Sequence, residues 1–596
     1  MRLSAFFVFA VLAAAQSVPR PEYPQPQFQR ELWMSLNGPW EFEYDDANHG
    51  MEQGWATADR KFGRTITVPF APETKLSGIG DTAFHPYVWY RRTVTLPAAW
   101  QGKRVLLHFG AVDYRASVWV NGRLVGQHEG GSVPFRFDVT EQWKAGANVI
   151  TVRAEDSPTD RYQPRGKQYW EPQSRGIFYT RTTGIWQPVW LEAAGTSYIE
   201  KLRTTPAIDG LVRLDARVAR PKTGQTLRAV VKFGNNTVAQ GEASAEGNRA
   251  TLSLTVNDPK LWNVGQGNLY DVTLELRAGG QVLDRVQTYY GYRQVTAENG
   301  RLYINGRPVF LKMVLDQGYW PESTITPPSE EAIQFDIKAM REMGFNGARK
   351  HQKVEDPRFL YWADRMGFLV SGETANAYLF DEDYAARFTR EWIEIIERDY
   401  NHPSIIMWIP VNESWGVHNP RDVQQQSHLK ANYHLLKSLD ATRLVIENDG
   451  WEHVDTTDLF GIHDYARTGE LLYDKYRDLS KLMTAFPPNG RAALVPGYRY
   501  NGSPIFLSEF GGIAYIAPGS NVPKDAWGYS GVEPNQASAQ ARMRGLWEAI
   551  AKMPHIMGIC YTQLTDVEQE INGLLTCDRK PKFDAKALRE MNDLLR

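Results

Sequence analysis

Two glutamates each come directly after a strongly apolar segment of the chain. Glu413, with Asn412 before it, follows residues 404–411, and Glu509 follows residues 505–507 after a single serine. Runs that are apolar at nearly every position are typical of strands buried on both faces of a parallel sheet. Two carboxylates at one end of such a sheet can cleave a glycosidic bond, because one protonates the leaving oxygen while the other attacks the anomeric carbon or activates water. From spacing alone, a glycosidase and another enzyme on the same sheet are equal alternatives.

Other polar side chains follow predicted strands in the same way. They are Glu373 after residues 368–370, Asn448 after residues 444–446, and Arg349 and His351 after a strand near Phe345. In a parallel barrel the carboxyl ends of all strands open on one face, so these groups should meet there. The sequence therefore predicts acids, an amide, an arginine and a histidine around one site.

Helices and strands alternate from residue 293 to residue 596. Residues 331–343 have apolar side chains at helical spacing and are followed by Gly344, a typical helix end. Asp356-Pro357 should begin the next helix, and Gly367 should end it. About 300 residues of this alternation fit a (β/α)8 TIM barrel. A doubly wound sheet would also fit, but no Gly-x-Gly-x-x-Gly follows a first strand.

The chain before the barrel is predicted to be all β. In residues 16–194, short apolar runs such as 104–109 and 116–120 read as strands, and Asn121-Gly122 as a hairpin turn, which indicates a β-sandwich. In residues 195–292, runs such as 211–218 alternate between apolar and polar residues, as in an immunoglobulin-like sandwich. The expected fold class is multidomain, with two β-sandwiches followed by an α/β barrel.

The composition narrows the class of protein. The chain has 596 residues and a formal net charge of -2, which argues against a nucleic-acid-binding protein. Apolar residues make up 42% and charged residues 23%, as in folded soluble chains. Two cysteines, Cys560 and Cys577, are too few for a disulfide framework or a four-ligand zinc site, and both should be free thiols in the core. We expect no cofactor and find no convincing cluster of metal ligands.

Residues 1–15 have the pattern of a secretory signal peptide. Met1-Arg2 provides a positive charge, and residues 6–15 form a short apolar run that ends in alanines. The run is too short to span a bilayer, and no cysteine follows it to suggest a lipid anchor. We therefore expect an exported protein, periplasmic or extracellular, without a membrane anchor. The alternative is that this segment forms a buried N-terminal strand.

Longer motifs connect these features. Residues 398–414 read RDYNHPSIIMWIPVNES and residues 506–512 read FLSEFGG, while residues 36–42, 89–92 and 184–191 read LNGPWEF, WYRR and GIWQPVWL. The first two resemble the acid/base and nucleophile segments of glycoside hydrolase family 2, the family of β-galactosidases, β-glucuronidases and β-mannosidases. The other three resemble its sugar-binding sandwich, which implies a jelly-roll-like fold for residues 16–194. The resemblance runs through almost the whole chain after the signal peptide.

The resemblance implies a role for each matched residue. Glu413 would be the acid/base and Glu509 the nucleophile of a retaining, two-step mechanism. Asn412 would contact the 2-hydroxyl of the substrate, and Arg349 would support the nucleophile. Further candidates for the sugar pocket are His351, Glu373, Asn448, His463 and Tyr465. For His351 and His463 a structural role is an equal alternative.

The motifs give less information about which sugar the protein releases. Many family members have His-Tyr-Pro shortly after an arginine, whereas this chain has Arg349-Lys350-His351-Gln352-Lys353. We expect the two lysines to be solvated charges at the start of a helix, or else to contact a polar substrate. The family's β-glucuronidases have Asn-x-Lys ahead of a segment like 578–582, but residues 570–573 contain no lysine. Because a cation is the expected partner of a uronate carboxylate, the sequence favours a neutral sugar.

The leading hypothesis is an exo-acting, β-galactosidase-like enzyme that binds the end of an oligosaccharide or polysaccharide. Related alternatives release α-L-arabinose, β-galactofuranose or β-glucuronic acid. A non-catalytic carbohydrate-binding protein is a third possibility, which the presence of both catalytic carboxylates argues against, since buried charges are costly to keep. The sequence does not indicate an oligomeric state.

Overall fold

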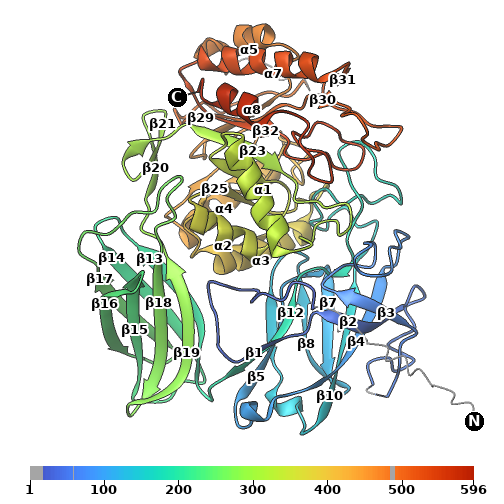
Figure 1. The fold of residues 1–596 in the computed structure, drawn as a ribbon, viewed down its shortest axis with the longest axis vertical. Helices are drawn as coiled ribbons and strands as arrows, with labels where there is room; N and C mark the ends of the chain where they lie inside the picture. Colours follow the sequence, from blue (N-terminus) through green and yellow to red (C-terminus); the bar gives the residue numbers. More distant parts are fainter. Residues whose placement is uncertain (1–17, 58, 484–489, 596) are drawn as a thin grey trace, which may run out of the picture.

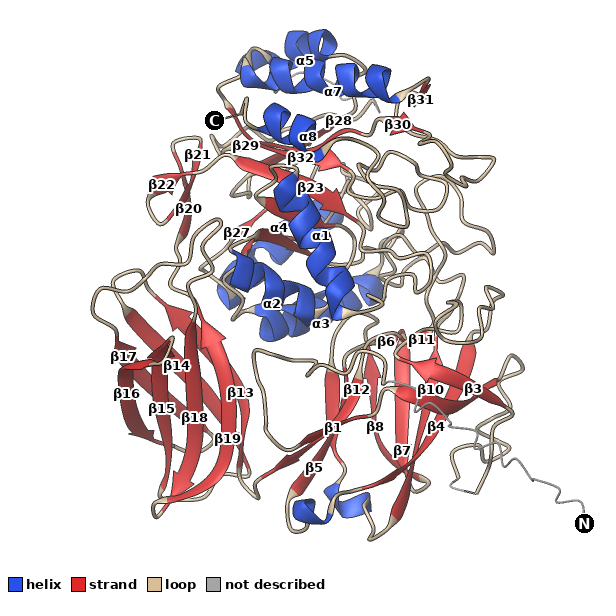
Figure 2. Cartoon of the chain, viewed as in Figure 1, coloured by secondary structure: helices blue, strands red, loops and turns tan. Residues whose placement is uncertain are grey.

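The computed structural model describes residues 18–57, 59–483 and 490–595. The predicted signal peptide, residues 1–15, lies outside them. Two β-sandwiches stand side by side under a larger α/β part (Figure 1). Figure 2 shows that nearly all the helices belong to that α/β part. This arrangement confirms the fold class predicted from the sequence.

The first sandwich is built from two main antiparallel sheets and one short pair of strands. The four-stranded sheet has the order β1-β12-β5-β9, with β1 Trp33–Ser35, β12 Val189–Ala194, β5 Arg104–Phe109 and β9 Phe135–Asp138. The six-stranded sheet has the order β3-β2-β4-β10-β7-β8, with β3 Arg64–Val68, β2 Gly38–Tyr44, β4 Tyr87–Thr95, β10 Ala147–Glu155, β7 Arg115–Val120 and β8 Arg123–Glu129. The short strands β6 Val112–Asp113 and β11 Gly184–Ile185 pair with each other. Asn121 and Gly122, with φ of 51° and 77°, make the predicted tight turn between β7 and β8.

The second sandwich has a three-stranded and a four-stranded sheet. The first has the order β13-β14-β17, with β13 Tyr198–Pro206, β14 Leu211–Ala219 and β17 Arg249–Thr255. The second has the order β16-β15-β18-β19, with β16 Asn236–Ser244, β15 Gln225–Phe233, β18 Tyr270–Ala278 and β19 Gln281–Tyr290. Every second side chain of β17 is buried, which is the predicted alternation of a strand with one face in a core.

Eight parallel strands form the sheet of the barrel. Their order is β27-β26-β25-β24-β23-β32-β29-β28. Their bounds are β23 Leu311–Asp316, β24 Gly347–Lys350, β25 Leu369–Glu373, β26 Ile405–Ile409, β27 Leu444–Val445, β28 Phe460–Asp464, β29 Ile505–Gly511 and β32 Ile556–Thr562. A small antiparallel sheet, β20 Val295–Glu298, β21 Arg301–Ile304 and β22 Arg307–Pro308, precedes the barrel, and β30 Ala514–Tyr515 pairs with β31 Val532–Glu533.

The helices of the barrel have clear local signals. They are α1 Glu330–Glu342, α2 Pro357–Met366, α3 Glu382–Asp399, α4 Val423–Leu439, α5 Gly469–Tyr476, α6 Leu479–Leu482, α7 Gln536–Ala551 and α8 Ala585–Asn592. The side chain of Asp356 accepts from the backbone N–H of Arg358 and so caps α2, which ends at Gly367 in the left-handed conformation. Both ends of α2 confirm the prediction. None of the helices in the described part of the chain is long and apolar enough to cross a membrane.

A long loop of the first sandwich reaches the barrel. It comprises residues 156–183, between β10 and β11, and is called the 156–183 loop below. The backbone N–H groups of Arg165 and Gly166 donate to the carbonyl of Asn376, at 3.1 and 3.0 Å. Farther along the loop, the Tyr179 hydroxyl donates to Glu570 Oε2 at 2.6 Å. The first sandwich is therefore bonded to residues that follow barrel strands β25 and β32.

The two cysteines are both free. Cys560 is buried in β32, as predicted, whereas Cys577 is only partly buried.

Candidate active site

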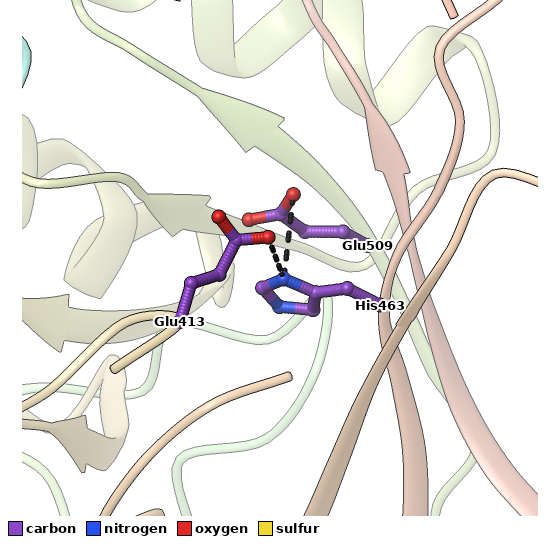
Figure 3. Close-up of side chains that lie close together, drawn as sticks. All are labelled: Glu413, His463 and Glu509. Atoms are coloured by element: carbon purple, nitrogen blue, oxygen red, sulfur yellow. Dashed lines mark hydrogen bonds and ion pairs between the residues drawn. The ribbon is translucent and has the colours of Figure 1, made fainter. Parts of the chain in front are cut away.

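The two predicted catalytic glutamates lie close together at the carboxyl ends of barrel strands. Glu509 lies within β29, and Glu413 lies just beyond β26. His463 of β28 lies between them, with Nδ1 2.7 Å from Glu413 Oε1 and 3.6 Å from Glu509 Oε2 (Figure 3). One carboxylate oxygen from each glutamate and one ring nitrogen all lie within 4.8 Å of one another. Residues far apart in the sequence thus form one compact group.

Arg349 of β24 connects the surrounding acids. Its Nη1 lies 2.9 Å from both Glu509 Oε1 and Asp449 Oδ2. Its Nε donates to Glu373 Oε2 at 3.0 Å, and its Nη2 donates to Asn412 Oδ1 at 2.6 Å. The guanidinium is fully buried, so its charge acts on these groups with little screening by water. This geometry fits the support of Glu509 that the family resemblance implied.

Burial and neighbouring charges shift the pKa values of the groups around the two glutamates in different directions. Burial opposes a charge on His463, but Glu509 and Asp449 outweigh it and raise the pKa of His463 to about 10. Burial also opposes a charge on Asp449, yet Arg349 and His463 hold its pKa well below the ordinary range. For Glu373 burial prevails over the attraction of Arg349 and raises the pKa to about 7. At neutral pH His463 is therefore a cation beside both glutamates.

Tyr465 holds the second oxygen of Glu509. Its hydroxyl donates to Glu509 Oε2 at 2.5 Å and lies 3.1 Å from the hydroxyl of Thr562. The ring stacks on Tyr529, with 3.5 Å between ring centroids. Burial and the nearby Glu509 charge raise the pKa of Tyr465 well above its ordinary value, which keeps the hydroxyl a donor. Tyr465 and Arg349 thus hold opposite oxygens of Glu509.

The turn that carries Glu413 has an unusual backbone. Glu413 and Ser414 both have positive φ, 53° and 59°, a region that side chains with a Cβ seldom adopt. The backbone N–H of Glu413 donates to the carbonyl of Asp449 at 2.9 Å, and that of Ser414 donates to Asn448 Oδ1 at 2.9 Å. The Asn448 side chain also donates to the carbonyl of Trp451. In the structure Asn448 holds this turn in place, and its contact with a sugar stays a prediction.

His351 lies beside Glu509, and Asn412 directly precedes Glu413. His351 Nδ1 lies 3.0 Å from Gln317 Oε1, and its Nε2 lies 3.5 Å from Glu509 Oε1. Burial, then the charges of Lys167 and Arg349, lower the pKa of His351 well below its ordinary value, so the ring is neutral. Neither His351 Nε2 nor Asn412 Nδ2 has a partner at normal hydrogen-bond geometry among the described residues. Both atoms are buried, and the contact of these two residues with a substrate stays a prediction.

The lysines on either side of His351 have structural partners. Lys350 Nζ lies 2.5 Å from Asp316 and 2.6 Å from Glu355, and Lys353 Nζ lies 3.2 Å from Glu355. Both side chains are buried. The expectation that they are solvated charges is wrong, because Glu355 pairs with both lysines and Asp316, at the end of the strand β23 that sequence analysis missed, pairs with Lys350.

Three family models match successive parts of the chain. They describe the sugar binding domain of glycosyl hydrolases family 2 at residues 33–170, glycosyl hydrolases family 2 at residues 197–293, and the family's TIM barrel domain at residues 295–528. The chain belongs to glycosyl hydrolase family 2. The resemblance seen in the sequence motifs is thereby confirmed, and the protein is a glycosidase.

Relatives within family 2 carry two different sugar specificities in their names. The β-glucuronidase of Canis lupus familiaris is 26% identical over 539 residues, which cover 82% of this chain and 79% of that one. A β-galactosidase of Leuconostoc mesenteroides is 26% identical over 483 residues, 73% of this chain and 44% of that one. A putative β-glucuronidase of Formosa agariphila is 27% identical over 400 residues, 64% of this chain and only 36% of that longer relative.

Solved structures of family 2 have the same fold. A β-glucuronidase of an uncultured Clostridium sp. superimposes with a TM-score of 0.77 at 22% identity, over 95% of this chain and 98% of that chain. The Ruminococcus gnavus β-glucuronidase in complex with D-glucuronic acid gives a TM-score of 0.76 at 19% identity, over 96% and 99%. At such identities the likeness shows the fold alone.

All nine residues that the sequence nominated lie in or directly around this family 2 site. Sequence analysis missed Asp449, Tyr529 and Lys167. Asp449 shares the strand-end signal of its neighbour Asn448, so the same reasoning could have found it. Tyr529 and Lys167 lie in loops, where no strand end marked them. Within the described residues, the one His and acid group with metal-ligand spacing is Glu413, His463 and Glu509, the proposed catalytic group itself.

Proposed function

We propose that the protein is a retaining exo-glycosidase that releases a terminal β-linked sugar by double displacement. The observation that carries this proposal is the close approach of the two glutamates, whose nearest potential ligand oxygens lie within 4.8 Å. Carboxyl groups about 5–5.5 Å apart are typical of retaining enzymes, whereas inverting enzymes leave about 6.5–9.5 Å for a water molecule.

In the proposed mechanism each glutamate has a separate role. In the first step Glu509 attacks the anomeric carbon and forms a glycosyl ester, while Glu413 gives its proton to the departing oxygen. In the second step Glu413 takes a proton from water, which attacks the anomeric carbon and frees Glu509. Glu509 is suited to be the nucleophile because Arg349 and Tyr465 hold both of its oxygens. Glu413 is partly exposed, as a group that exchanges protons with a leaving group and water must be.

The proposal also concerns which terminal sugar the protein releases. The sequence favoured a neutral sugar and a β-galactosidase-like enzyme, and the named β-galactosidase relative supports this. A β-glucuronide is supported equally well, because other relatives and the structural neighbours are named β-glucuronidases. Export is also part of the proposal and rests on the pattern of residues 1–15.

A trapping experiment tests the mechanism. The protein should be incubated with 2-deoxy-2-fluoro glycosides bearing a dinitrophenyl leaving group, in the galactose and the glucuronic acid series. We expect a stable adduct on the peptide that contains Glu509, and none with Glu509→Gln. Proton NMR of the first product should show the same anomeric configuration as the substrate. An inverted first product would overturn the retaining assignment.

A further inference from the structure

Lys167 of the 156–183 loop is a buried cation beside the active site. Only 6% of its surface is exposed. Its Nζ lies 5.3 Å from the ring centroid of Trp415 and 5.9 Å from that of Tyr179. Trp415 follows Glu413 by two residues, and its backbone N–H donates to the carbonyl of Asn412 at 2.8 Å. Lys167 thus lies over the segment that carries the proposed acid/base.

The backbone on either side fixes the position of Lys167. Gly166 has φ of 58°, and a Cβ there would lie 2.4 Å from the carbonyl oxygen of Gln352, the residue after His351. The carbonyl of Lys167 accepts from the backbone N–H of Tyr179 at 2.8 Å. Because the loop is bonded on both sides of this residue, the lysine is presented to the site by rigid backbone.

The ammonium group has no polar partner of its own. Among the residues that the structure describes, Lys167 Nζ makes no hydrogen bond and no ion pair within 4.0 Å, only the two ring contacts. The side chain is largely buried, but its Nζ is not one of the polar atoms that are cut off from water, so an acceptor on a ligand can reach it. Lys350 and Lys353, by contrast, are both neutralised by carboxylates.

Glu570 is an acid in the neighbourhood, but its oxygens are already engaged. Oε2 accepts from the Tyr179 hydroxyl at 2.6 Å, and Oε1 accepts from Asn572 Nδ2 at 3.0 Å. Burial raises the pKa of Glu570, and the charge of Lys167 opposes that rise. A role as remote counter-charge to Glu570 is therefore the competing explanation for Lys167, and the experiment must separate the two.

We propose that Lys167 selects the substrate by binding a carboxylate on the terminal sugar, so that the preferred substrate is a hexuronide. This inference rests on the proposed glycosidase mechanism. A carboxylate would give the three N–H donors a charged acceptor, and such bonds are stronger than those between neutral groups. The missing lysine at residues 570–573 then does not exclude a uronide, because a cation reaches the site from a different domain.

The experiment compares matched substrates on the full-length protein. The substrates are aryl β-D-glucuronide, β-D-galacturonide, β-D-glucoside and β-D-galactoside, together with the uncharged glucuronamide. We expect kcat/KM for one of the two uronides to exceed that for its neutral partner by about 100-fold or more, since a site built for a polar group rejects substrates that lack it. If the preferred uronide is the glucuronide, the glucuronamide should lose the same factor. The amide comparison needs no mutation and so does not depend on the folding of a variant.

Lys167→Met should then lose about 100-fold in kcat/KM on the preferred uronide and less than about 3-fold on neutral sugars. Arg161→Met is the matched control, because it removes an exposed cation from the same loop. An equal loss on all substrates would show that Lys167 only balances Glu570 and would overturn the inference. Wild-type turnover of neutral sugars alone would also overturn it and would leave the glycosidase mechanism standing. Failure to cleave or be trapped by any glycoside would instead count against the proposed function.

Discussion

The Tyr465 hydroxyl donates a hydrogen bond of 2.5 Å to Oε2 of Glu509, the oxygen that Arg349 does not contact. A bond of this kind to a carboxylate contributes about 1.5–3 kcal/mol. It fixes the orientation of the proposed nucleophile. Tyr465→Phe removes the bond and keeps the ring that stacks on Tyr529.

We therefore expect Tyr465→Phe to lower kcat/KM by about 10- to 100-fold. The rate of trapping by a 2-deoxy-2-fluoro glycoside should fall by a similar factor, because Glu509 acts in that step. Tyr433→Phe is the control, since its hydroxyl donates to Asp458 at 2.8 Å outside the site. Equal trapping rates for wild type and Tyr465→Phe would contradict this role.

Substitution of the two glutamates should give different results. Glu509→Gln should abolish turnover of every substrate, because no glycosyl ester can form. Glu413→Gln should lose about 10²- to 10⁴-fold on glycosides with poor leaving groups. It should still form the ester rapidly from dinitrophenyl glycosides, whose leaving group needs little proton donation. Stopped-flow release of dinitrophenolate measures this step, and full activity of Glu509→Gln would refute the assignment.

The charge on His463 should make stability depend on pH. Folding raises the pKa of His463 from 6.5 to about 10, so the folded chain keeps a proton that the unfolded chain loses between these values. Its contribution to stability is therefore complete below pH 6.5 and disappears as the pH rises through 10.

Thermal unfolding from pH 6 to pH 10 measures this effect. His463→Asn should melt below wild type at pH 6, and the difference should narrow toward pH 10. His434→Asn, which changes an exposed histidine of α4, should give a curve parallel to that of wild type. A gap between wild type and His463→Asn that stays constant with pH would contradict the assigned charge.

Sequence reasoning succeeded where the signal was local. Glu413 lies shortly after β26 and Glu509 lies within β29, so the apolar runs before them were enough to mark both residues. Sequence reasoning was less able to tell which of two adjacent residues faces the site. Asn448 and Asp449 follow the same strand, yet Asn448 holds the Glu413 turn while Asp449 faces Arg349 and His463. Which of two adjacent side chains faces the site depends on a one-residue phase that the sequence does not set.

Other features were beyond sequence reasoning for a different reason. Lys167 lies in the first sandwich and reaches the site only because the 156–183 loop bonds to Asn376 and Glu570. A contact between two domains leaves no periodic pattern in either. β28, which carries His463, was not recognised as a strand, because its sequence FGIHD lacks a continuous apolar run.

Gly166 provides a test of the loop geometry that leaves Lys167 itself unchanged. Gly166→Ala would place a Cβ 2.4 Å from the Gln352 carbonyl and should displace the loop. We expect kcat/KM on the preferred uronide to fall by about 10-fold or more. Gly176→Ala, in the same loop and with nearly the same φ of 59°, meets no atom within 4 Å and is the matched control. Equal effects of the two substitutions would mean that backbone strain alone is responsible.

The attachment of the 156–183 loop also bears on how such enzymes diversify. The barrel carries the groups proposed to break the bond, and a lysine that precedes Glu413 by 246 residues lies beside them. On the proposed role of Lys167, a gene rearrangement that exchanges the first sandwich would change sugar preference without altering a single catalytic side chain. For the same reason, a barrel produced alone would retain its reactive glutamates but lose the cation that we propose recognises a carboxylate on the sugar.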